Sequence, residues 1–542
     1  MIHEKDVQIT VRDGVKIAVR IYRPDGAGPF PALFAPSPYR YDNNELPAQP
    51  MFLWRETGPI EWYVDQGYAY VQADVRGTGF SQGNYEFLGR NEQQDLYDVI
   101  EWIGTRPWSN GKVGGIGQSY FAMSQWFMGI QNPPHLACLG LYDGLNDPYR
   151  FMGYPGGIEG NFLYYWFNAS LRVANLYPAN GQHPRQVPDD MMLEVQRHPL
   201  YDHYWKERAA IEQIDKIKVP VFSIGVWAKQ DLHLDGNIRG YQMLNAPKKL
   251  AITGTATAFS SAIDFADVEF HKKYLLPFYD MYLKGAKTSY ATRPNVEYAI
   301  RNTNIVRAFE TWPPPGVTYR PLYFAKGPSG SVASVNDGAL DGAAPAGGGS
   351  VSYSYPNPKW VLGNVPLGPQ GPDPARAVLT FTGAPLPADM EIAGHAKVVL
   401  HASSTRTDMD FIVKLSEQFA QGSDERGKGL QPRYAIVTKG WLRASHMERD
   451  PRRNTNHSPY YTHAASTPLQ PGKIYKIEIA LQPIAHIFKQ GSRIRVEVSC
   501  ADSPVTDGLF GHVYRPDKIG TDTIHHDAEH ASHLVLPVLK TG

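Results

Sequence analysis

A serine flanked by glycines provides the clearest chemistry in this sequence. Residues 113–126 read V-G-G-I-G-Q-S-Y-F-A-M-S-Q-W, so a short apolar strand runs into Ser119 and a helical pattern follows at once. This order is typical of a nucleophile elbow, a tight turn that lifts one hydroxyl above the edge of a sheet. Gly115 and Gly117 leave room for neighbouring backbone because they carry no Cβ. Phe121 replaces the last glycine of G-x-S-x-G, and a glycine-rich turn with an incidental serine is the competing interpretation.

The segments around this turn predict an α/β domain. A hairpin is expected over 6–22 around Asp13-Gly14, and an amphipathic helix over 93–105. Buried strands are expected at 31–36, 68–75, 219–226 and 249–253. Strands that alternate with helices indicate a largely parallel sheet. The N-terminus of the helix after Ser119 would point backbone N–H groups and the helix dipole at a developing oxyanion.

Length and composition limit the classes of protein. At 542 residues the chain exceeds one hydrophobic core, so two or three domains are expected. Lysine plus arginine and aspartate plus glutamate both number 53, which argues against nucleic-acid or anionic-membrane partners. The 11 tryptophans and 32 tyrosines suit packed cores and apolar pockets.

The same features predict a cytoplasmic protein without a membrane span. Cys138 and Cys500 are too few for a disulfide framework and suggest a reducing compartment. The first ten residues are charged and lack the apolar run of a signal peptide, and nowhere do 18 apolar residues follow one another.

Several further segments, taken in order, resemble the cocaine esterase/X-Pro dipeptidyl-peptidase family of α/β-hydrolases. They are D-V-R-G-T-G-F-S-Q-G at 74–83, D-L-Y-D-V-I-E-W-I-G-T-R-P-W-S-N-G-K-V-G at 95–114, G-Q-S-Y at 117–120, Y-W-K-E-R at 204–208, I-K-V-P at 217–220, Y-L-K-G at 282–285, G-W-L-R-A-S at 440–445 and G-S-R-I-R at 491–495. The resemblance covers nearly the whole chain. It implies an α/β-hydrolase core at 1–146 and 211–312, a helical cap at 147–210 and a C-terminal jelly-roll β-sandwich at 313–542.

The resemblance implies the triad order serine, aspartate, histidine. Its acid corresponds to Asp231, eight residues before Arg239, although the loop after Trp227 is longer than the family pattern. Asp235 is the second candidate, and its position before a helical run predicts an N-cap instead.

The expected histidine is missing. The family places it after the next strand in a Gly-Pro-Trp-x-His-type sequence, and the count here falls on Ala258, or on Ala256 if the loop is shorter by two. His233 lies in the same loop as Asp231, too close in sequence to face it, and the helical run around His271 predicts a surface or packing role. Alanine cannot accept a proton, so the sequence predicts an impaired enzyme. An engineered variant and a natural relative that lost catalysis both fit, and the otherwise intact site favours engineering.

The resemblance also implies the oxyanion hole. Its donors would be the backbone N–H of Tyr120 and the hydroxyl of Tyr39, for which a core tyrosine is the alternative. Aromatic residues should line the substrate pocket, and the candidates are Trp166, Phe167, Phe80 and Trp227.

The C-terminal part of the chain predicts a structural domain. Short strands with frequent turns follow Trp312-Pro313-Pro314-Pro315 and fit a β-sandwich. The histidines at 525, 526, 530 and 533 lack the cysteines or spaced carboxylates of a metal site, so no metal and no cofactor are expected.

The sequence as a whole predicts a serine hydrolase that cleaves carboxylic esters through an acyl-enzyme, with a small-molecule ester (or amide) as the substrate. An alternative is a peptidase or α-amino acid ester hydrolase that binds a free ammonium, for which Glu159, Asp42 and Glu45 are the candidate carboxylates. A pseudoenzyme that binds a ligand in the old pocket is the other alternative. The acyl and alcohol groups stay undefined, and whether the chain forms a homo-oligomer is open.

Overall fold

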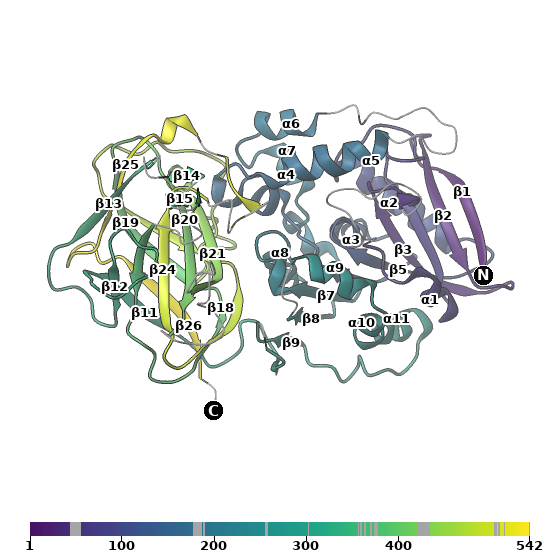
Figure 1. Cartoon of the computed structure of the whole chain (residues 1–542). Coiled ribbons are helices and arrows are strands. Elements are labelled where there is room, and N and C mark those ends of the chain that lie inside the picture. Colours follow the sequence, from purple (N-terminus) through teal and green to yellow (C-terminus); the bar gives the residue numbers. More distant parts are fainter. Residues whose placement is uncertain are drawn as a thin grey trace. The chain divides into compact units, whose positions relative to one another are not determined.

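The computed structural model describes residues 1–43, 56–176, 187, 190–254, 258–301, 303–355, 357, 360–362, 365–368, 371–372, 378–420, 434–502, 507, 510–513 and 515–540. The chain divides into two compact units (Figure 1). The first unit comprises Met1–Phe151, Leu163–His198 and His203–Glu310, and the second comprises Met152–Phe162, Pro199–Asp202 and Thr311–Gly542. The predicted limits of core, cap and C-terminal domain stay a prediction.

The described residues of the first unit form a ten-stranded sheet. Its strands, in spatial order, are β1 (Ile2–Thr10), β2 (Lys16–Arg23), β4 (Ala69–Asp74), β3 (Phe30–Ser37), β5 (Ser109–Gln118), β6 (Leu136–Tyr142), β7 (Val221–Val226), β8 (Lys248–Thr253), β9 (Val296–Ala299) and β10 (Val306–Phe309). All neighbours from β4 to β9 are parallel, and β1, β2 and β10 are antiparallel to their neighbours. Parallel strands need helical crossovers, so this sheet confirms the predicted α/β class.

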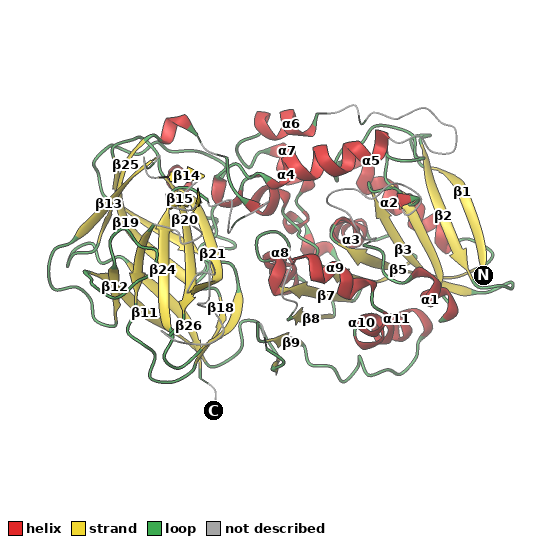
Figure 2. Ribbon diagram, in the orientation of Figure 1, coloured by secondary structure: helices red, strands yellow, loops and turns green. Residues whose placement is uncertain are grey.

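Helices connect these strands in the first unit (Figure 2). They are α1 (Ile60–Asp65), α2 (Arg90–Gly104), α3 (Tyr120–Gln131), α8 (Leu234–Met243), α9 (Ala258–Ala266), α10 (Val268–Lys273) and α11 (Leu275–Lys284). Between β6 and β7 come short helices, among them α4 (Phe162–Trp166), α5 (Arg172–Leu176), α6 (Met191–Arg197) and α7 (His203–Arg208), with π-helical turns at Tyr149–Gly153 and Phe167–Leu171. The helix after Ser119, α3, is buried from Tyr120 to Ile130, which explains why its sequence is apolar on every side.

The second unit is built of β-strands and confirms the predicted C-terminal β-sandwich. Its larger sheet contains β11 (Val317–Ala325), β12 (Gly338–Asp341), β13 (Ser350–Tyr355), β17 (Leu379–Thr382), β18 (Met390–Gly394), β19 (Lys397–Ser404), β20 (Asp410–Gln418), β21 (Tyr434–Arg443), β22 (Tyr475–Ala480), β23 (Ile484–Phe488), β24 (Arg493–Ser499), β25 (Gly520–His525) and β26 (His533–Leu539). A smaller sheet contains β14 (Trp360–Leu362), β15 (Val365–Gly368) and β16 (Gly371–Pro372).

A buried histidine anchors the loop that precedes α1. His271 of α10 contacts the Tyr63 hydroxyl through Nδ1 at 2.8 Å and the Phe265 carbonyl through Nε2 at 2.6 Å. Its ring packs on Gly58, where an added Cβ would come within 2.7 Å of the imidazole. This arrangement confirms the packing role predicted for His271 and fixes the chain two residues after Glu56.

Burial lowers the pKa of His271 to about 4, so acid should weaken this anchor. Above the unfolded pKa of about 6.5 both states are neutral and nothing is lost. Between the two pKa values the unfolded chain binds a proton that the folded site excludes, a cost of about 2 kcal/mol near pH 5. His271→Asn lacks this titration, so its stability deficit relative to the unchanged protein should shrink as the pH falls from about 7.5 to about 5.

Thermal unfolding of both proteins at the two pH values measures this change. His203→Asn, at an exposed histidine of α7, is the control and should show a small, constant difference. A His271→Asn deficit that does not change with pH would contradict the buried neutral imidazole.

Candidate active site

The turn between β5 and α3 holds Ser119 in a strained conformation. Its φ of 59° and ψ of −119° are unusual for a residue with a side chain. The Ser119 N–H donates to the carbonyls of Tyr142 and Asp143, both at 3.1 Å, and its carbonyl accepts the first hydrogen bonds of α3. Gly117 has a φ of 133°, and a Cβ there would lie 2.3 Å from the Cβ of Phe121. Glycine at 117 is therefore a requirement of the turn.

Three polar side chains reach the partly exposed Ser119 hydroxyl. His233 Nε2 lies 3.2 Å from Ser119 Oγ. The Tyr39 hydroxyl and the Glu56 carboxyl lie beside the Ser119 side chain, which acts to lower the pKa of each. Tyr39 follows β3, Glu56 precedes α1, and His233 follows β7. Because β3, β5, β6 and β7 are adjacent parallel strands, their carboxyl ends meet at one edge of the sheet, the usual place for a site in such a fold.

His233 is the residue that sequence reasoning missed most clearly. It is buried at the N-terminus of α8, and its Nδ1 accepts the Leu145 N–H at 3.3 Å. Burial, with a smaller contribution from Lys229, lowers its pKa well below the usual range, so the ring is neutral. Its two-residue separation from Asp231 says nothing about its distance from Ser119, which follows β5, separated from β7 in the sheet by β6. The only signal was its position in the loop after β7.

Glu56 was also missed. Its side chain is buried, and among the described residues its Oε2 has no hydrogen-bond partner. Burial first, and then the Asp143 charge, raise the pKa of Glu56 to about 8, although Lys229 and the Ser119 hydroxyl act in the opposite direction. Its backbone carbonyl accepts the Gln118 N–H at 2.9 Å, which ties this loop to the end of β5. No sequence motif marks this residue.

Tyr39 lies in an aromatic cluster beside the nucleophile turn. Its hydroxyl accepts the Trp166 indole N–H at 3.0 Å, and its ring packs edge-on against Tyr120 with centroids 6.0 Å apart. Burial raises the pKa of Tyr39 well above the usual range, so the hydroxyl keeps its proton. Tyr120 is the first residue of α3, where the backbone N–H has no partner within the helix. Both predicted oxyanion donors are therefore adjacent to Ser119.

The two candidate acids after β7 lie in different settings. Asp231 is partly exposed and stands between the short helical turn Trp227–Lys229 and α8. Asp235 lies inside the first turn of α8 and pairs with Arg239 at 2.7 Å. The N-cap residue is His233, so the prediction of Asp235 as the N-cap is wrong. Asp235 therefore lies inside the helix and pairs with a side chain one turn further along it.

Ala258 is the first residue of α9, and the alternative position, Ala256, lies outside the described residues. One turn further, the Ser261 hydroxyl is 3.2 Å from Gln118 Nε2, which also donates to Asp143 at 3.0 Å. The start of α9 is thus near the residue before the nucleophile. The assignment of Ala258 to the vacant base position stays a prediction.

The predicted pocket aromatics occupy different places. Trp166 contacts Tyr39 directly, as described above. Phe80 stacks on Tyr41 with centroids 5.0 Å apart. Phe167 is fully buried, and the Trp227 indole donates to the Ala299 carbonyl at 2.6 Å. A role in substrate binding stays a prediction for these residues.

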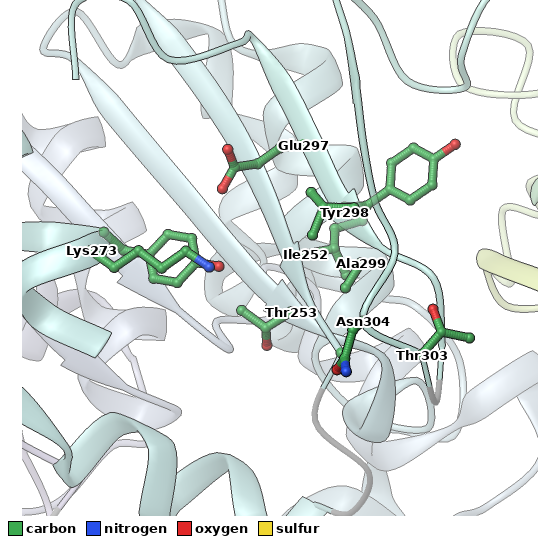
Figure 3. Close-up of a pocket in the computed structure, with 11 residues that line it drawn as sticks. Ile252, Thr253, Lys273, Glu297, Tyr298, Ala299, Thr303 and Asn304 are labelled. Atoms are coloured by element: carbon green, nitrogen blue, oxygen red, sulfur yellow. The ribbon is translucent and has the colours of Figure 1, made fainter. Parts of the chain in front are cut away.

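A cavity of about 380 Å³ lies at the ends of β8 and β9. Figure 3 shows residues that line it. Lys273 and Glu297 contribute its charged side chains, and Glu297 is paired with Arg293. The full lining is Ile252, Thr253, Gly254, Lys273, Tyr274, Glu297, Tyr298, Ala299, Thr303, Asn304 and Val306. Ala299 lines this cavity, and its carbonyl accepts the Trp227 indole N–H. The cavity therefore lies beside the loop after β7.

Within the part of the chain that the structure describes, no group of three or more histidine, cysteine or acidic side chains is arranged to hold a metal ion. None of the described helices has the length and apolar character needed to cross a membrane.

Comparisons with known proteins agree with this geometry. Residues 13–256 match the model of the X-Pro dipeptidyl-peptidase (S15) family, and residues 289–535 match its C-terminal non-catalytic domain. The chain is 25% identical to a cocaine esterase from Rhodococcus sp., over 99% of this chain and 98% of the relative. It is 22% identical to a putative Xaa-Pro dipeptidyl-peptidase from Bacillus anthracis, over 98% and 85%. A crystal structure of a CocE/NonD family hydrolase from Staphylococcus aureus is 26% identical with a TM-score of 0.83, over 99% of this chain and 94% of that one.

The sheet, the strained serine and these matches define an α/β-hydrolase. Within that class, the chain belongs to the cocaine esterase/X-Pro dipeptidyl-peptidase family. The predicted resemblance is confirmed.

The turn at Ser119 can be tested through Gly117. Gly117→Ala places a Cβ against Phe121 at a φ that alanine rarely adopts, so the strand end must shift. We expect a loss of stability of about 1–3 kcal/mol and at least a tenfold slower reaction of Ser119 with a fluorophosphonate. Labelling rate by mass spectrometry and thermal unfolding are the measurements. Gly342→Ala, where an added Cβ meets nothing, is the matched control, and equal labelling of both variants would contradict the strained turn.

Proposed function

We propose that this chain is a serine hydrolase that cleaves carboxylic esters through an acyl-enzyme on Ser119. The observation that carries the proposal is the Ser119 hydroxyl, which is held on a strained turn and contacted by His233, Tyr39 and Glu56. A resting serine without such contacts is a weak nucleophile, and neighbouring proton donors and acceptors activate it. The family membership supports hydrolysis of small-molecule acyl compounds.

The proposed oxyanion hole combines Tyr39 and Tyr120. The Trp166 indole N–H occupies one acceptor position of the Tyr39 oxygen, so the Tyr39 proton can be directed at the negative oxygen of a tetrahedral intermediate. The Tyr120 N–H at the start of α3 would supply the second donor, with the helix dipole in the favourable direction. Donors fixed in this way stabilise the transition state more than the substrate.

An ester is favoured over a substrate with a free ammonium group. Of the carboxylates proposed for ammonium binding, Asp42 is paired with Arg40 at 2.7 Å and is therefore already neutralised. Glu159 belongs to the second unit, and Glu45 lies outside the described residues. The peptidase or α-amino acid ester hydrolase alternative thus has little support from these three residues.

The competing proposal is an impaired enzyme or ligand-binding pseudoenzyme, which follows from alanine at position 258. The contact between His233 and Ser119 supports activity instead, because polar groups from other loops already surround the hydroxyl. Restoring a histidine at 258 separates the two proposals.

For an active esterase we expect turnover of a short chromogenic ester by the unchanged chain. Ser119→Ala should reduce that turnover by about 10³-fold or more, as when a member of a catalytic triad is removed. Ala258→His should change the rate less than about tenfold, because a base is already present. Ser124→Ala, at a buried serine of α3 whose hydroxyl bonds only the helix backbone, is the matched control.

Two results would count against the proposal. Turnover that survives Ser119→Ala would contradict the assignment of Ser119 as the nucleophile. An inactive parent that gains about 10³-fold from Ala258→His would establish the vacant-base alternative.

A further inference from the structure

The proton of the Ser119 hydroxyl needs an acceptor, and the hydrogen bonds around it restrict the choice. Tyr39 accepts the Trp166 indole N–H and is a protonated phenol, so it acts toward Ser119 as a donor. A neutral imidazole carries a proton on one nitrogen alone. Because His233 Nδ1 accepts the Leu145 N–H, the ring proton resides on Nε2, the nitrogen 3.2 Å from Ser119 Oγ.

His233 therefore donates to Ser119 Oγ in this arrangement. An imidazole with its proton on the nitrogen that faces the nucleophile cannot accept a second proton there. Among the described neighbours of Ser119, the Glu56 carboxyl is then the one with acceptor capacity, and no described residue hydrogen-bonds its Oε2.

We propose that the Glu56 carboxylate, rather than the His233 imidazole, is the general base that accepts the Ser119 proton. The inference rests on the proposed function of Ser119 as the nucleophile. It assigns a catalytic role to a residue that the aspartate-histidine pattern of the family does not include.

The charges around Glu56 suit this role. Burial and the neighbouring Asp143 raise its pKa, whereas Lys229 and the Ser119 hydroxyl lower it, and the outcome is a pKa of about 8. Tyr39 lies near Glu56 as a neutral phenol, and His233, which contacts Ser119, is a neutral ring. A general base works best when its pKa lies near the operating pH, a condition that Glu56 meets and an ordinary surface carboxylate does not.

The proton balance closes without another reactant. The Ser119 oxygen bonds to the ester carbon as Glu56 takes the hydroxyl proton, and the carbonyl electrons move to the oxygen in the oxyanion hole. Collapse of this intermediate breaks the bond to the alcohol oxygen, which leaves with the proton from Glu56. Water then attacks the acyl-enzyme while Glu56 takes one of its protons, and that proton returns to Ser119 as the acid departs.

His233 is a positioning residue in this scheme. Its Nε2–H orients the Ser119 oxygen and stabilises the negative charge that develops there during attack. A glutamine side chain can also donate a hydrogen bond from its amide, so His233→Gln keeps this capacity, whereas Glu56→Gln removes the only proton acceptor that the proposal uses.

The test measures the reaction of Ser119 with a fluorophosphonate, together with kcat/KM for a chromogenic ester, from about pH 6 to pH 10. In the unchanged protein both rates should rise about tenfold per pH unit and level off near pH 8, because Glu56 must lose its proton to act. Glu56→Gln should reduce both rates by about 10³-fold and abolish their increase with pH. His233→Gln should reduce both rates by about tenfold or less and leave their increase with pH in place. Glu56→Asp, with a shorter carboxylate, should recover part of the loss.

Glu92→Gln is the matched control, because Glu92 is a fully buried carboxyl with a pKa raised to about 7 that bonds the Tyr120 hydroxyl instead of Ser119. It should leave the pH midpoint unchanged. Thermal unfolding identifies any variant that fails to fold. If Glu56→Gln does not fold, Glu56→Asp and the pH profile of the unchanged protein test the assignment of Glu56 as the base.

A flat profile above about pH 7, with a 10³-fold loss in His233→Gln, would overturn the proposal in favour of an imidazole base. Labelling measures Ser119 without turnover, so the two proposals fail separately. If the protein does not turn over the ester but its labelling still depends on Glu56, the esterase function alone is refuted. Turnover present but independent of Glu56 would refute the assignment of the base alone. A Ser119 that does not react with the probe at any pH would refute the nucleophile, and the assignment of its base with it.

Discussion

The positive φ of Ser119 is the constraint on which the rest of the site depends. A serine adopts this backbone conformation only when its surroundings hold it there. Here the Ser119 N–H is fixed by two carbonyls at the end of β6, and Gly117 allows Phe121 to approach the strand. In return, the turn places the hydroxyl where the loops after β3 and β7 and the segment before α1 converge. The buried helix α3 and the parallel strands beside it supply the packing that offsets the strain.

Burial at this convergence also shifts the pKa values of the titratable groups around the nucleophile toward their neutral forms. Burial raises the pKa of Glu56 and of Asp143, to about 8 and about 6, and keeps His233 neutral. Lys229 is the cation that influences all three groups. Removing Lys229 would therefore disturb several protonation equilibria at once, so its effects could not be assigned to a single residue without measuring each titration.

The fold was largely accessible from the sequence, because its determinants are local. Alternating strands and helices, the glycines before Ser119 and the family motifs predicted the α/β-hydrolase core and the C-terminal β-sandwich. Element boundaries differed by a few residues; for example, the helix expected at 93–105 begins at Arg90. These features depend on short-range patterning, which a single sequence contains.

The partners of Ser119 were less accessible, because long-range contacts decide them. His233 was judged by its distance in sequence from Asp231, whereas its position depends on the parallel pairing of β5, β6 and β7. Glu56 stands 63 positions before Ser119 in a segment without a motif, and only burial makes it unusual. The prediction for Asp235 followed a local rule for helix caps. In the structure Asp235 lies inside the helix instead, where it pairs with Arg239.

The hydrogen bond from Trp166 to Tyr39 joins a residue predicted to line the substrate pocket to the proposed oxyanion donor. Trp166 belongs to the short helices inserted between β6 and β7, the segment predicted to form the cap. In this chain, however, the same segment orients a phenol beside the nucleophile. Grafting that insertion from one relative onto another would therefore exchange part of the catalytic machinery along with the selectivity, and a graft that binds its new substrate well could still turn it over slowly.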